Sequence, residues 1–366
     1  MALAVGGSVW TGCGAGNTID DDSSDGSGGA DGNANSSANG FTDGSGAGST
    51  GSGPQCTDPS CIGGGVQGNC DQSLALDSSD AMDGARAIGL CQQASNGSWG
   101  VVSAEWVGSG GQPLSGSGLL GKGILDHFGN SVSPREGAKL LALSSGTARN
   151  PSDAGYQSVG GYWKDCVDDP NCDGVFTLPQ PDSTPPGYPS TSATCDVQAG
   201  EAFDSAGLRV TIKTPTDAKS LSYSLKFYTY EFPDYICSQY NDFFVAIMNP
   251  APTGALSGNI SFDSQGNTIS VNAGFLDECN PGQLSGYDCP AGYDEIVGTG
   301  FDEQDPGSGA TSWLETTAPI ESPGSEITLH FAIWDSGDGV LDSTILIDNF
   351  KFEVDENSVG TTPIPQ

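Results

Sequence analysis

Alternating apolar and polar residues recur along the C-terminal half of the chain, and they constrain its fold more than any other feature. In the run Leu221–Tyr230, the residues Leu221, Tyr223, Leu225 and Phe227 fall on one face of an extended strand. Further runs follow, separated by clusters of Gly, Pro and Asn: Asp242–Met248, Thr268–Asn272, Glu326–Trp334 and Thr344–Val354. Because no helical pattern separates these runs, we predict a mainly all-β fold, an antiparallel β-sandwich of jelly-roll type.

The part of the chain before these runs has a mixed pattern. Ser78–Gln92 begins with cap-like Ser and Asp residues and has apolar residues at helical spacing, which predicts a short helix. Trp99–Val107 and Ala138–Gly146 have the composition of strands or buried apolar segments. We therefore expect one or two short helices beside the sandwich.

These patterns divide the 366-residue chain into regions. The β-sandwich domain is expected to span residues 56–356, with an N-terminal part at 56–200 and the core sandwich at 201–356. Residues 357–366 are polar and contain proline, so we expect a tail.

The segment 14–55 consists almost entirely of Gly, Ser, Asp, Asn, Ala and Thr, and Phe41 is its one aromatic residue. Such a segment cannot bury enough apolar surface to offset the entropy lost on ordering. We predict a disordered acidic linker that tethers the folded domain.

Residues 1–13 resemble the end of a bacterial lipoprotein signal, because a short apolar run and small residues precede Cys13. The expected consequence is a lipid attached to Cys13. The alternative is a truncated ordinary signal peptide in which Cys13 is incidental, since no positively charged residue precedes the apolar run.

The formal net charge of −35, with only eleven lysines and arginines, excludes several classes of partner. Nucleic-acid binding requires clustered cations that neutralise phosphates. Electrostatic docking onto an anionic membrane has the same requirement. We therefore expect no nucleic-acid partner, and contact with a membrane only through a lipid anchor.

The chain has eleven cysteines and no CxxC pair, which favours disulfides over a zinc site. If Cys13 carries a lipid, ten remain to pair. Short separations favour Cys56–Cys61, Cys166–Cys172 and Cys279–Cys289, Cys195 is the expected partner of Cys237, and Cys70–Cys91 then remains. Sequence alone leaves other connectivities open. Disulfides indicate an exported protein, either at the bacterial outer membrane or cell surface as a lipoprotein or secreted.

From Phe227 to Phe350 the chain has no lysine or arginine, although this stretch holds nineteen aspartates and glutamates. Where such carboxylates converge, the compensating charge must come from elsewhere. Asp335, Asp338 and Asp342 lie in a glycine-containing loop, and calcium prefers hard oxygen ligands from loops of this kind. We predict a Ca²⁺ site there, with a solvated acidic turn as the alternative.

Asp348 is a further candidate calcium ligand. Strict alternation places it on the same face as Leu346, Phe350 and Phe352, where an unpaired carboxylate is costly to desolvate. A metal ion would compensate it, and backbone N–H groups at a corner of the sandwich are the alternative.

A second acidic segment contributes Glu231 and Asp242 as possible ligands of the same ion. The tyrosines around them suggest either a sugar-binding surface or ordinary core packing. Glu231 and Asp335 could also serve as the paired carboxylates of a glycoside hydrolase, provided that their separation is suitable.

Several long segments together resemble the choice-of-anchor L family of bacterial surface proteins. The resemblance extends from about Cys70 to Val354 and is carried by Ala85–Cys91, Trp99–Val107, Phe128–Arg149, Phe227–Pro250, Gly258–Asn272, Gly298–Phe301 and Thr311–Phe350. It implies a secreted or surface-anchored β-rich domain whose attachment device varies among members, and it implies no established activity. Because it covers both halves of the folded region, we expect residues 56–200 to contribute strands to the sandwich.

These observations lead to one expected function and two alternatives. We expect a non-enzymatic, monomeric, lipid-anchored surface protein whose calcium-stabilised sandwich binds a glycan or a protein in adhesion. The alternatives are a secreted glycoside hydrolase and a purely structural envelope protein.

Overall fold

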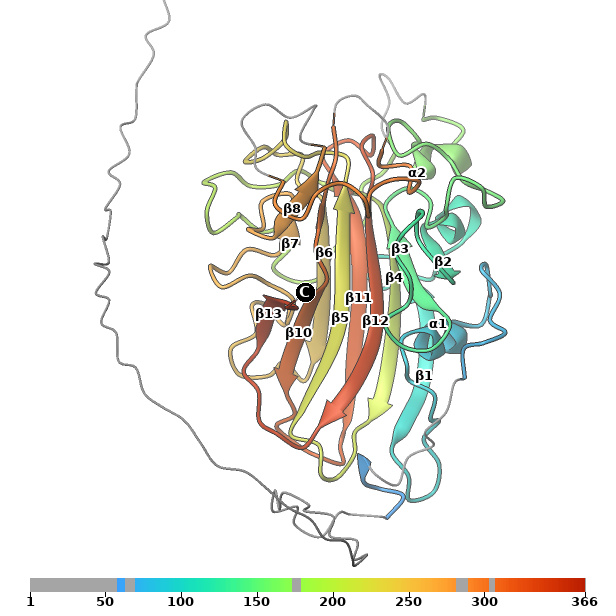
Figure 1. Cartoon of the computed structure of the whole chain (residues 1–366), viewed down its shortest axis with the longest axis vertical. Coiled ribbons are helices and arrows are strands. Elements are labelled where there is room, and N and C mark those ends of the chain that lie inside the picture. The colour runs from blue at the N-terminus through green and yellow to red at the C-terminus, as the bar shows by residue number, and fades with distance from the viewer. Residues whose placement is uncertain (1–57, 63–69, 173–178, 281–288, 303–306, 366) are drawn as a thin grey trace, which may run out of the picture. The chain divides into compact units, whose positions relative to one another are not determined.

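The protein is described by a computed structural model that covers residues 58–62, 70–172, 179–280, 289–302 and 307–365. Cys13 and the predicted linker at 14–55 lie outside these residues. Within them, the strands form a five-stranded and an eight-stranded antiparallel sheet (Figure 1). The predicted all-β sandwich is confirmed.

The five-stranded sheet, called here the first sheet, draws its strands from both halves of the sequence. Their spatial order is β1 (Gly100–Val107), β4 (Ala202–Lys213), β11 (Glu326–Ser336), β6 (Phe243–Asn249) and β7 (Ile269–Ser270). The long strand β11 pairs with β4 on one side and with β6 on the other.

The eight-stranded sheet, called here the second sheet, faces the first. Its main path is β13 (Gly360–Pro363), β10 (Leu314–Pro319), β5 (Ser220–Thr229), β12 (Ser343–Glu353), β3 (Leu140–Ser144) and β2 (Lys122–Leu125). Off this path, β9 (Gly309–Thr311) pairs with β5, and β8 (Leu276–Cys279) pairs with β9. Consecutive central strands change sheet, since β4, β5 and β6 alternate between the two sheets, as do β10, β11 and β12.

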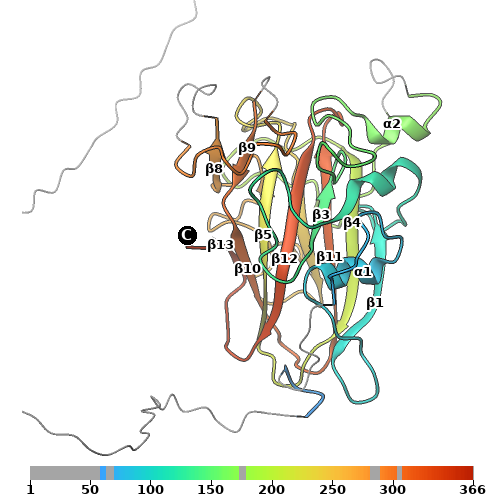
Figure 2. The ribbon, with the colours of Figure 1, turned by 45° about the vertical axis from the view of Figure 1, so that its right-hand side comes forward.

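The described helices are all short: α1 (Ala81–Ala87), the 3₁₀ helix η2 (Gly116–Gly121) and α2 (Lys164–Asp168). The predicted helix is α1, and its first turn is capped because the Asp80 side chain accepts a hydrogen bond from the backbone N–H of Met82. In the turned view of Figure 2, α1 lies beside β1. Gly84 allows this approach, because a Cβ there would collide with the ring of Trp106.

The main core lies between the two sheets. The predicted apolar face of β5, from Leu221 to Phe227, points into it and meets Phe331 of β11 and Phe244 of β6. The ring centroids of Tyr223 and Phe331 are 5.2 Å apart in an edge-to-face arrangement, which joins the sheets at the centre.

A second core covers the opposite face of the second sheet. Tyr228 of β5 and Leu346 of β12 belong to it, together with Phe128, Ile296 and Phe301 from the connecting segments. All residues of β5 are buried as a result. Strict polar–apolar alternation is therefore absent from its burial pattern, as expected for a strand covered on both faces.

The predicted faces of the last long strand are wrong beyond Asp348. The pairing of β12 with β5 shifts between Asp348 and Lys351, and Asn349 has a left-handed φ of 58°. This β-bulge reverses the alternation, so Ile347 before it and Phe350 after it both reach the main core. Asp348 consequently does not share a face with Phe350.

The predicted polar tail is also wrong in part. Gly360–Pro363 forms β13, which pairs with β10 at the edge of the second sheet. The Thr361 hydroxyl lies 2.7 Å from that of Thr316, in a buried polar contact. A proline and polar residues are compatible with an edge strand, because one side of its backbone pairs with no other strand.

Disulfides join segments that the sheets leave apart. Of the predicted pairs, Cys70–Cys91, Cys166–Cys172, Cys195–Cys237 and Cys279–Cys289 are confirmed. Cys61 is disulfide-bonded as well, and Cys56, its expected partner, lies outside the described residues. These bonds are typical of a protein exported to an oxidising compartment.

Candidate functional site

Five of the six predicted calcium ligands lie at one end of the sandwich. Glu231 follows β5, Asp242 precedes β6, Asp335 lies near the end of β11, and Asp338 and Asp342 lie in the connection from β11 to β12. Strand pairing brings these segments together, since the start of β12 pairs with the end of β5 and the end of β11 pairs with the start of β6. This end is at the top of Figure 1.

Asp204 of β4 is a sixth member that the sequence did not reveal. Its carboxylate raises the pKa of both Asp335 and Asp342, which places it beside them. We call the six residues the acidic cluster: Asp204, Glu231, Asp242, Asp335, Asp338 and Asp342.

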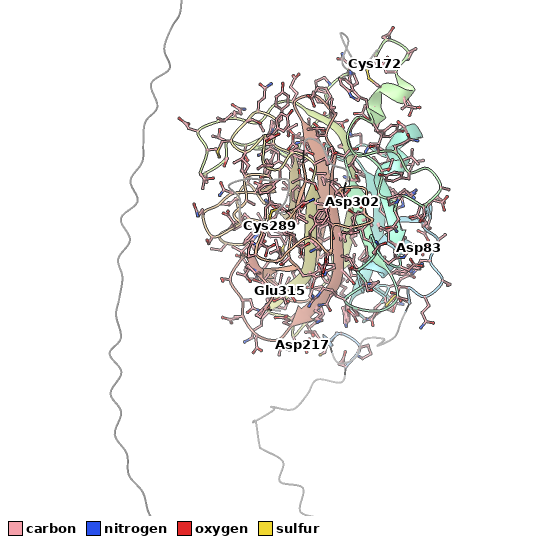
Figure 3. The ribbon with its side chains drawn as sticks, turned by 45° about the horizontal axis from the view of Figure 1, so that its top comes forward. Asp83, Cys172, Asp217, Cys289, Asp302 and Glu315 are labelled. Carbon is pink, nitrogen blue, oxygen red and sulfur yellow. A yellow bond between two sulfur atoms is a disulfide. The ribbon has the colours of Figure 1, made fainter. Side chains whose placement is uncertain are left out.

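The acidic cluster is buried, whereas many acidic side chains elsewhere lie at the surface. Every member except Asp338 is at most 3% exposed, and Asp338 is partly buried. In Figure 3, the labelled residues Asp83, Asp217 and Asp302 are spread over the molecule. The cluster is therefore a specific feature of one end of the fold, and it does not simply reflect the acidic composition.

Backbone N–H groups satisfy some of these carboxylate oxygens. The backbone N–H of Asp242 donates to Glu231 Oε2 at 3.1 Å, that of Ser336 donates to Asp242 Oδ1 at 3.0 Å, and that of Gly339 donates to Asp335 Oδ1 at 3.0 Å. These bonds tie the loops together across the two sheets.

Other buried oxygens at this end have no hydrogen-bond partner in the described part of the chain. They are Asp242 Oδ2, Asp335 Oδ2, both carboxylate oxygens of Asp342, and the side-chain oxygen of the neighbouring Asn241. Buried polar atoms are normally hydrogen-bonded. So many unpaired oxygens on neighbouring residues suggest that they bind a ligand or carry protons.

Burial is the main cause of raised pKa values in the cluster. It raises the pKa of Asp242 to about 8, against the opposing effects of the nearby Ser343 hydroxyl and of the hydrogen bond from the backbone N–H of Ser336. Burial also raises the pKa of Asp335 well above its usual range, and the charges of Asp242, Asp338, Asp204 and Asp342 add to this effect. Without a cation, the Asp242 carboxyl would hold a proton at neutral pH.

The pKa values of Glu231 and Asp342 are also well above their ordinary range. For Glu231, burial is the largest cause, followed by the charges of Asp242 and Asp335. For Asp342, burial and the charge of Asp204 raise the pKa, and Lys164 lowers it.

Lys164, at the start of α2, is the lysine that the fold brings to this cluster. Its buried Nζ donates to the backbone carbonyls of Asp204 at 2.7 Å, Ser144 at 3.1 Å and Gly146 at 3.4 Å. The ion pairs recorded among the described residues include none between any lysine or arginine and the acidic cluster. Within the cluster, the charge of Lys164 lowers the pKa only of Asp204 and Asp342.

Lys164 and Asp204 lacked a signal in the sequence. Neither stands in a sequence pattern that points to this site, and they meet only because α2 packs against β4. The backbone N–H of Lys164 donates to Asp204 Oδ2 at 3.0 Å, which fixes the two relative to each other.

The side chains are not prearranged around an ion. Among the described residues, no group of three or more His, Cys, Asp and Glu side chains has the arrangement of a metal site. A cation would therefore have to draw the unpaired oxygens together.

Asp348 does not belong to the acidic cluster, which corrects its predicted role. It lies five residues beyond Ser343 along β12, roughly 16 Å away at the usual strand rise. Its Oδ2 accepts hydrogen bonds from the backbone N–H groups of Arg135 at 2.6 Å and Glu136 at 3.2 Å. Burial raises its pKa to about 6, and these bonds limit the rise. Backbone N–H groups, the stated alternative to a metal ion, therefore compensate the Asp348 carboxylate.

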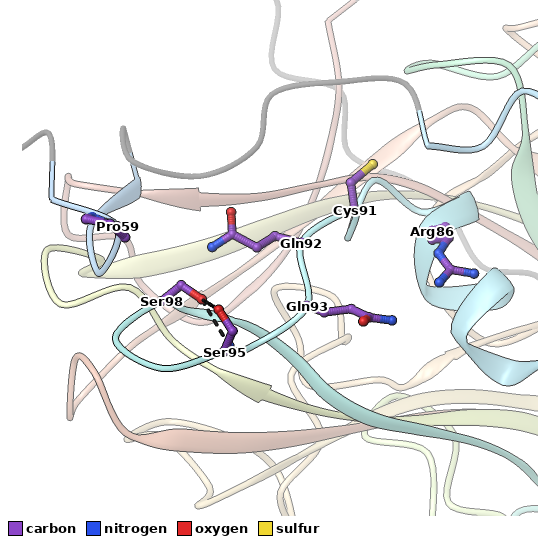
Figure 4. A pocket seen from close by; sticks show the side chains of 7 residues that line it. All are labelled: Pro59, Arg86, Cys91, Gln92, Gln93, Ser95 and Ser98. Carbon is purple, nitrogen blue, oxygen red and sulfur yellow. Dashed lines mark hydrogen bonds between the residues drawn. The ribbon is translucent and has the colours of Figure 1, made fainter.

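A surface pocket lies away from this cluster, beside α1. It measures about 480 Å³ and is lined by Arg86, Gln92, Gln93, Ser95 and Ser98, among others (Figure 4). Arg86 already pairs with Asp83 at 2.5 Å, so its charge is largely used within the protein.

Two further observations bear on location and relationship. None of the helices in the described segments has the length and apolar character needed to cross a membrane. A scan against protein-family models found no match for this chain, and searches of curated protein sequences and of solved structures found none either.

Proposed function

We propose that the protein is a non-enzymatic, lipid-anchored bacterial surface module whose β-sandwich is stabilised by calcium and binds a glycan or protein partner in adhesion. The observation that carries the calcium part is the acidic cluster, in which buried carboxylate oxygens lack hydrogen-bond partners among the described residues and no recorded ion pair joins the cluster to a lysine or arginine there. The disulfides support an exterior location, where calcium is available.

The donor atoms match the chemistry of calcium. Calcium takes about six to eight oxygen ligands in flexible geometry, and it accepts carboxylate, amide and carbonyl oxygens. The unpaired oxygens of Asn241, Asp242, Asp335 and Asp342 are all of these types. Gly337 and Gly339 both have positive φ, which gives the loop before Asp342 the turns that such a site uses.

Calcium should raise the melting temperature relative to protein in EDTA. A concentration about a hundred times the dissociation constant stabilises by about 2.7 kcal/mol, or roughly 5 °C for a domain of this size. Differential scanning calorimetry measures the shift. The double variant Asp335→Asn/Asp342→Asn should lose it while remaining folded, and Asp348→Asn should retain it. An unchanged melting temperature in the unmodified protein would remove calcium from the proposal.

The hydrolase alternative has less support. Glu231 and Asp335 are both buried, so neither side chain can reach a glycosidic bond in this conformation. Activity on a panel of polysaccharides that disappears in both Glu231→Gln and Asp335→Asn would favour it nonetheless. A glycan array, probed with the protein in calcium and in EDTA, separates an adhesion module from a purely structural envelope protein. The structural protein would bind none of the glycans.

The proposed anchor rests on Cys13 and on the resemblance to the choice-of-anchor L family, in which the attachment device varies. Cys13→Ser should move the protein from the detergent phase to the aqueous phase in a Triton X-114 partition of cells that express the full chain. Ser8→Ala is the matched control and should stay with the detergent. Equal partition of Cys13→Ser and the unmodified protein would rule out lipidation at this residue.

A further inference from the structure

A second buried charged group, independent of the acidic cluster, surrounds Lys226 of β5. Lys226 shares a strand face with Tyr228, which packs in the second core, and its side chain is fully buried. The ammonium group lies 5.5 Å from the centre of the Tyr228 ring. A lysine in such a position needs close partners.

Two glutamates and one carbonyl surround the Nζ atom. Glu278 Oε1 of β8 lies at 2.5 Å, Glu295 Oε2 at 2.7 Å, and the backbone carbonyl of Thr311 accepts a hydrogen bond at 2.7 Å. All three donor positions of the amine are thus directed at oxygens, and two of these oxygens belong to carboxyl groups.

The two glutamates differ in their surroundings. The Glu278 side chain is 3% exposed, and its Oε2 has no hydrogen-bond partner among the residues that the structure describes. The Glu295 side chain is 40% exposed and can exchange protons with solvent. The Glu278 carboxyl is therefore excluded from solvent and held against the amine, whereas the Glu295 carboxyl lies between the amine and solvent.

An ion pair buried in this way is costly to desolvate, which favours transfer of a proton from the amine to a carboxylate. Burial raises the pKa of Glu278 to about 7, against the charge of Lys226, and the charge of Glu295 adds to the rise. The neutral acid is therefore well populated near neutral pH. A neutral amine beside a neutral carboxylic acid has the composition of an amide plus one water.

We propose that Lys226 and Glu278 condense to form an intramolecular isopeptide bond. The Nζ lone pair attacks the Glu278 carboxyl carbon, the new C–N bond forms, and the C–O bond to Oε2 breaks. Glu295 accepts a proton from Nζ and returns it to the departing oxygen, which leaves as water. No oxidant, reductant or activated donor is needed.

Holding the reacting groups together supplies much of the driving force. Fixed neighbours within a folded protein react as though present at very high concentration, and a dry site disfavours the reverse hydrolysis. The unpaired Oε2 is the atom that departs in this scheme, and no protein hydrogen bond among the described residues has to break to release it.

The bond would fasten the short strand β8 to the central part of the second sheet. Lys226 and Glu278 are 52 residues apart in sequence. In the sheet, the short strand β9 lies between β8 and β5 and pairs with both. A covalent link across β9 would hold β8 to the central sheet and shorten the loop available to the unfolded chain.

Trypsin digestion of the full-length, reduced and alkylated protein tests the bond directly. Without it, trypsin releases the heptapeptide Ser220–Lys226 and the long peptide Phe227–Lys351, since no lysine or arginine intervenes. With the bond, Lys226 resists cleavage, and mass spectrometry should find Ser220–Lys351 lighter by one water. Recovery of Ser220–Lys226, or of Ser220–Lys351 at full mass, would overturn the proposal and leave a buried ion pair.

Variants extend this test to the mechanism. Glu278→Gln should give the same amide by loss of ammonia, and so a product of identical mass. Lys226→Arg should be cleaved after residue 226, and the two resulting peptides should have their full masses, with no water lost. Glu295→Gln should slow bond formation while circular dichroism shows a folded protein, and an unchanged rate would remove Glu295 from the scheme.

Discussion

Replacing Lys164 with methionine is expected to lower the free energy of unfolding by about 3–5 kcal/mol. The substitution removes the ammonium group that lies beside Asp204 and Asp342, and it leaves three backbone carbonyls without their donor. Loss of one partner from a buried charged group leaves the other partners uncompensated, which costs more than the original interaction gains. Methionine has a similar length, so the change in packing is small.

Urea denaturation followed by circular dichroism measures this effect. Lys219→Met is the matched control, because Lys219 is half exposed and its ion pair with Glu356 at 3.7 Å lies at the surface. Surface pairs contribute little, so the control should change stability by less than about 1 kcal/mol. Equal effects of the two substitutions would show that Lys164 does not compensate the acidic cluster.

The calcium-free protein is expected to become less stable as the pH rises from about 4 to about 8. Asp242 has an ordinary pKa of 3.8 and a folded-state pKa of about 8, so the folded protein holds a proton that the unfolded chain releases. Its contribution to stability is complete below the unfolded pKa and is lost as the pH rises through the folded pKa. Each such proton changes the free energy of unfolding by up to about 1.4 kcal/mol per pH unit.

Urea denaturation in EDTA at several pH values measures this slope. Asp242→Asn should reduce it, and Glu326→Gln, at an exposed position of β11, should leave it unchanged. Saturating calcium should reduce the loss at high pH, because a bound cation keeps the carboxyls ionised without the penalty of burial. A calcium-free protein whose stability is constant or rises between pH 5 and pH 8 would contradict the proton-bound state of the cluster.

Local pattern was sufficient to predict most of the strands. The spacing of Leu221, Tyr223, Leu225 and Phe227 identified a core face, because alternation follows directly from strand geometry. The same rule failed at Asn349, where one residue in a left-handed conformation shifts the register of β12. A bulge of this kind depends on the neighbouring strands and leaves little trace in a single sequence.

The acidic cluster was predictable only in part, for a related reason. The aspartates of the loop after β11 and the acids near Cys237 stand out in the sequence because cations are missing around them. Lys164 and Asp204 reach the same place through long-range packing of α2 on β4, which no local spacing encodes. The strand β13 escaped notice because an edge strand needs no apolar periodicity.

The second core has a consequence for where a partner can approach. Because connecting segments cover the outer face of the second sheet, the long strands of that sheet are interior on both sides, and their side chains have little freedom to vary. The first sheet differs in part, since half-buried polar residues such as Arg209, Thr211 and His330 line the outward side of β4 and β11. Nearer the acidic cluster, the outward side is covered, because Phe243, Val245 and Trp334 form a further buried cluster with Tyr188. The outward side of the first sheet is thus covered at one end and accessible at the other. A recognition surface formed by strands would have to use that accessible part, where side chains can change without disturbing the cores.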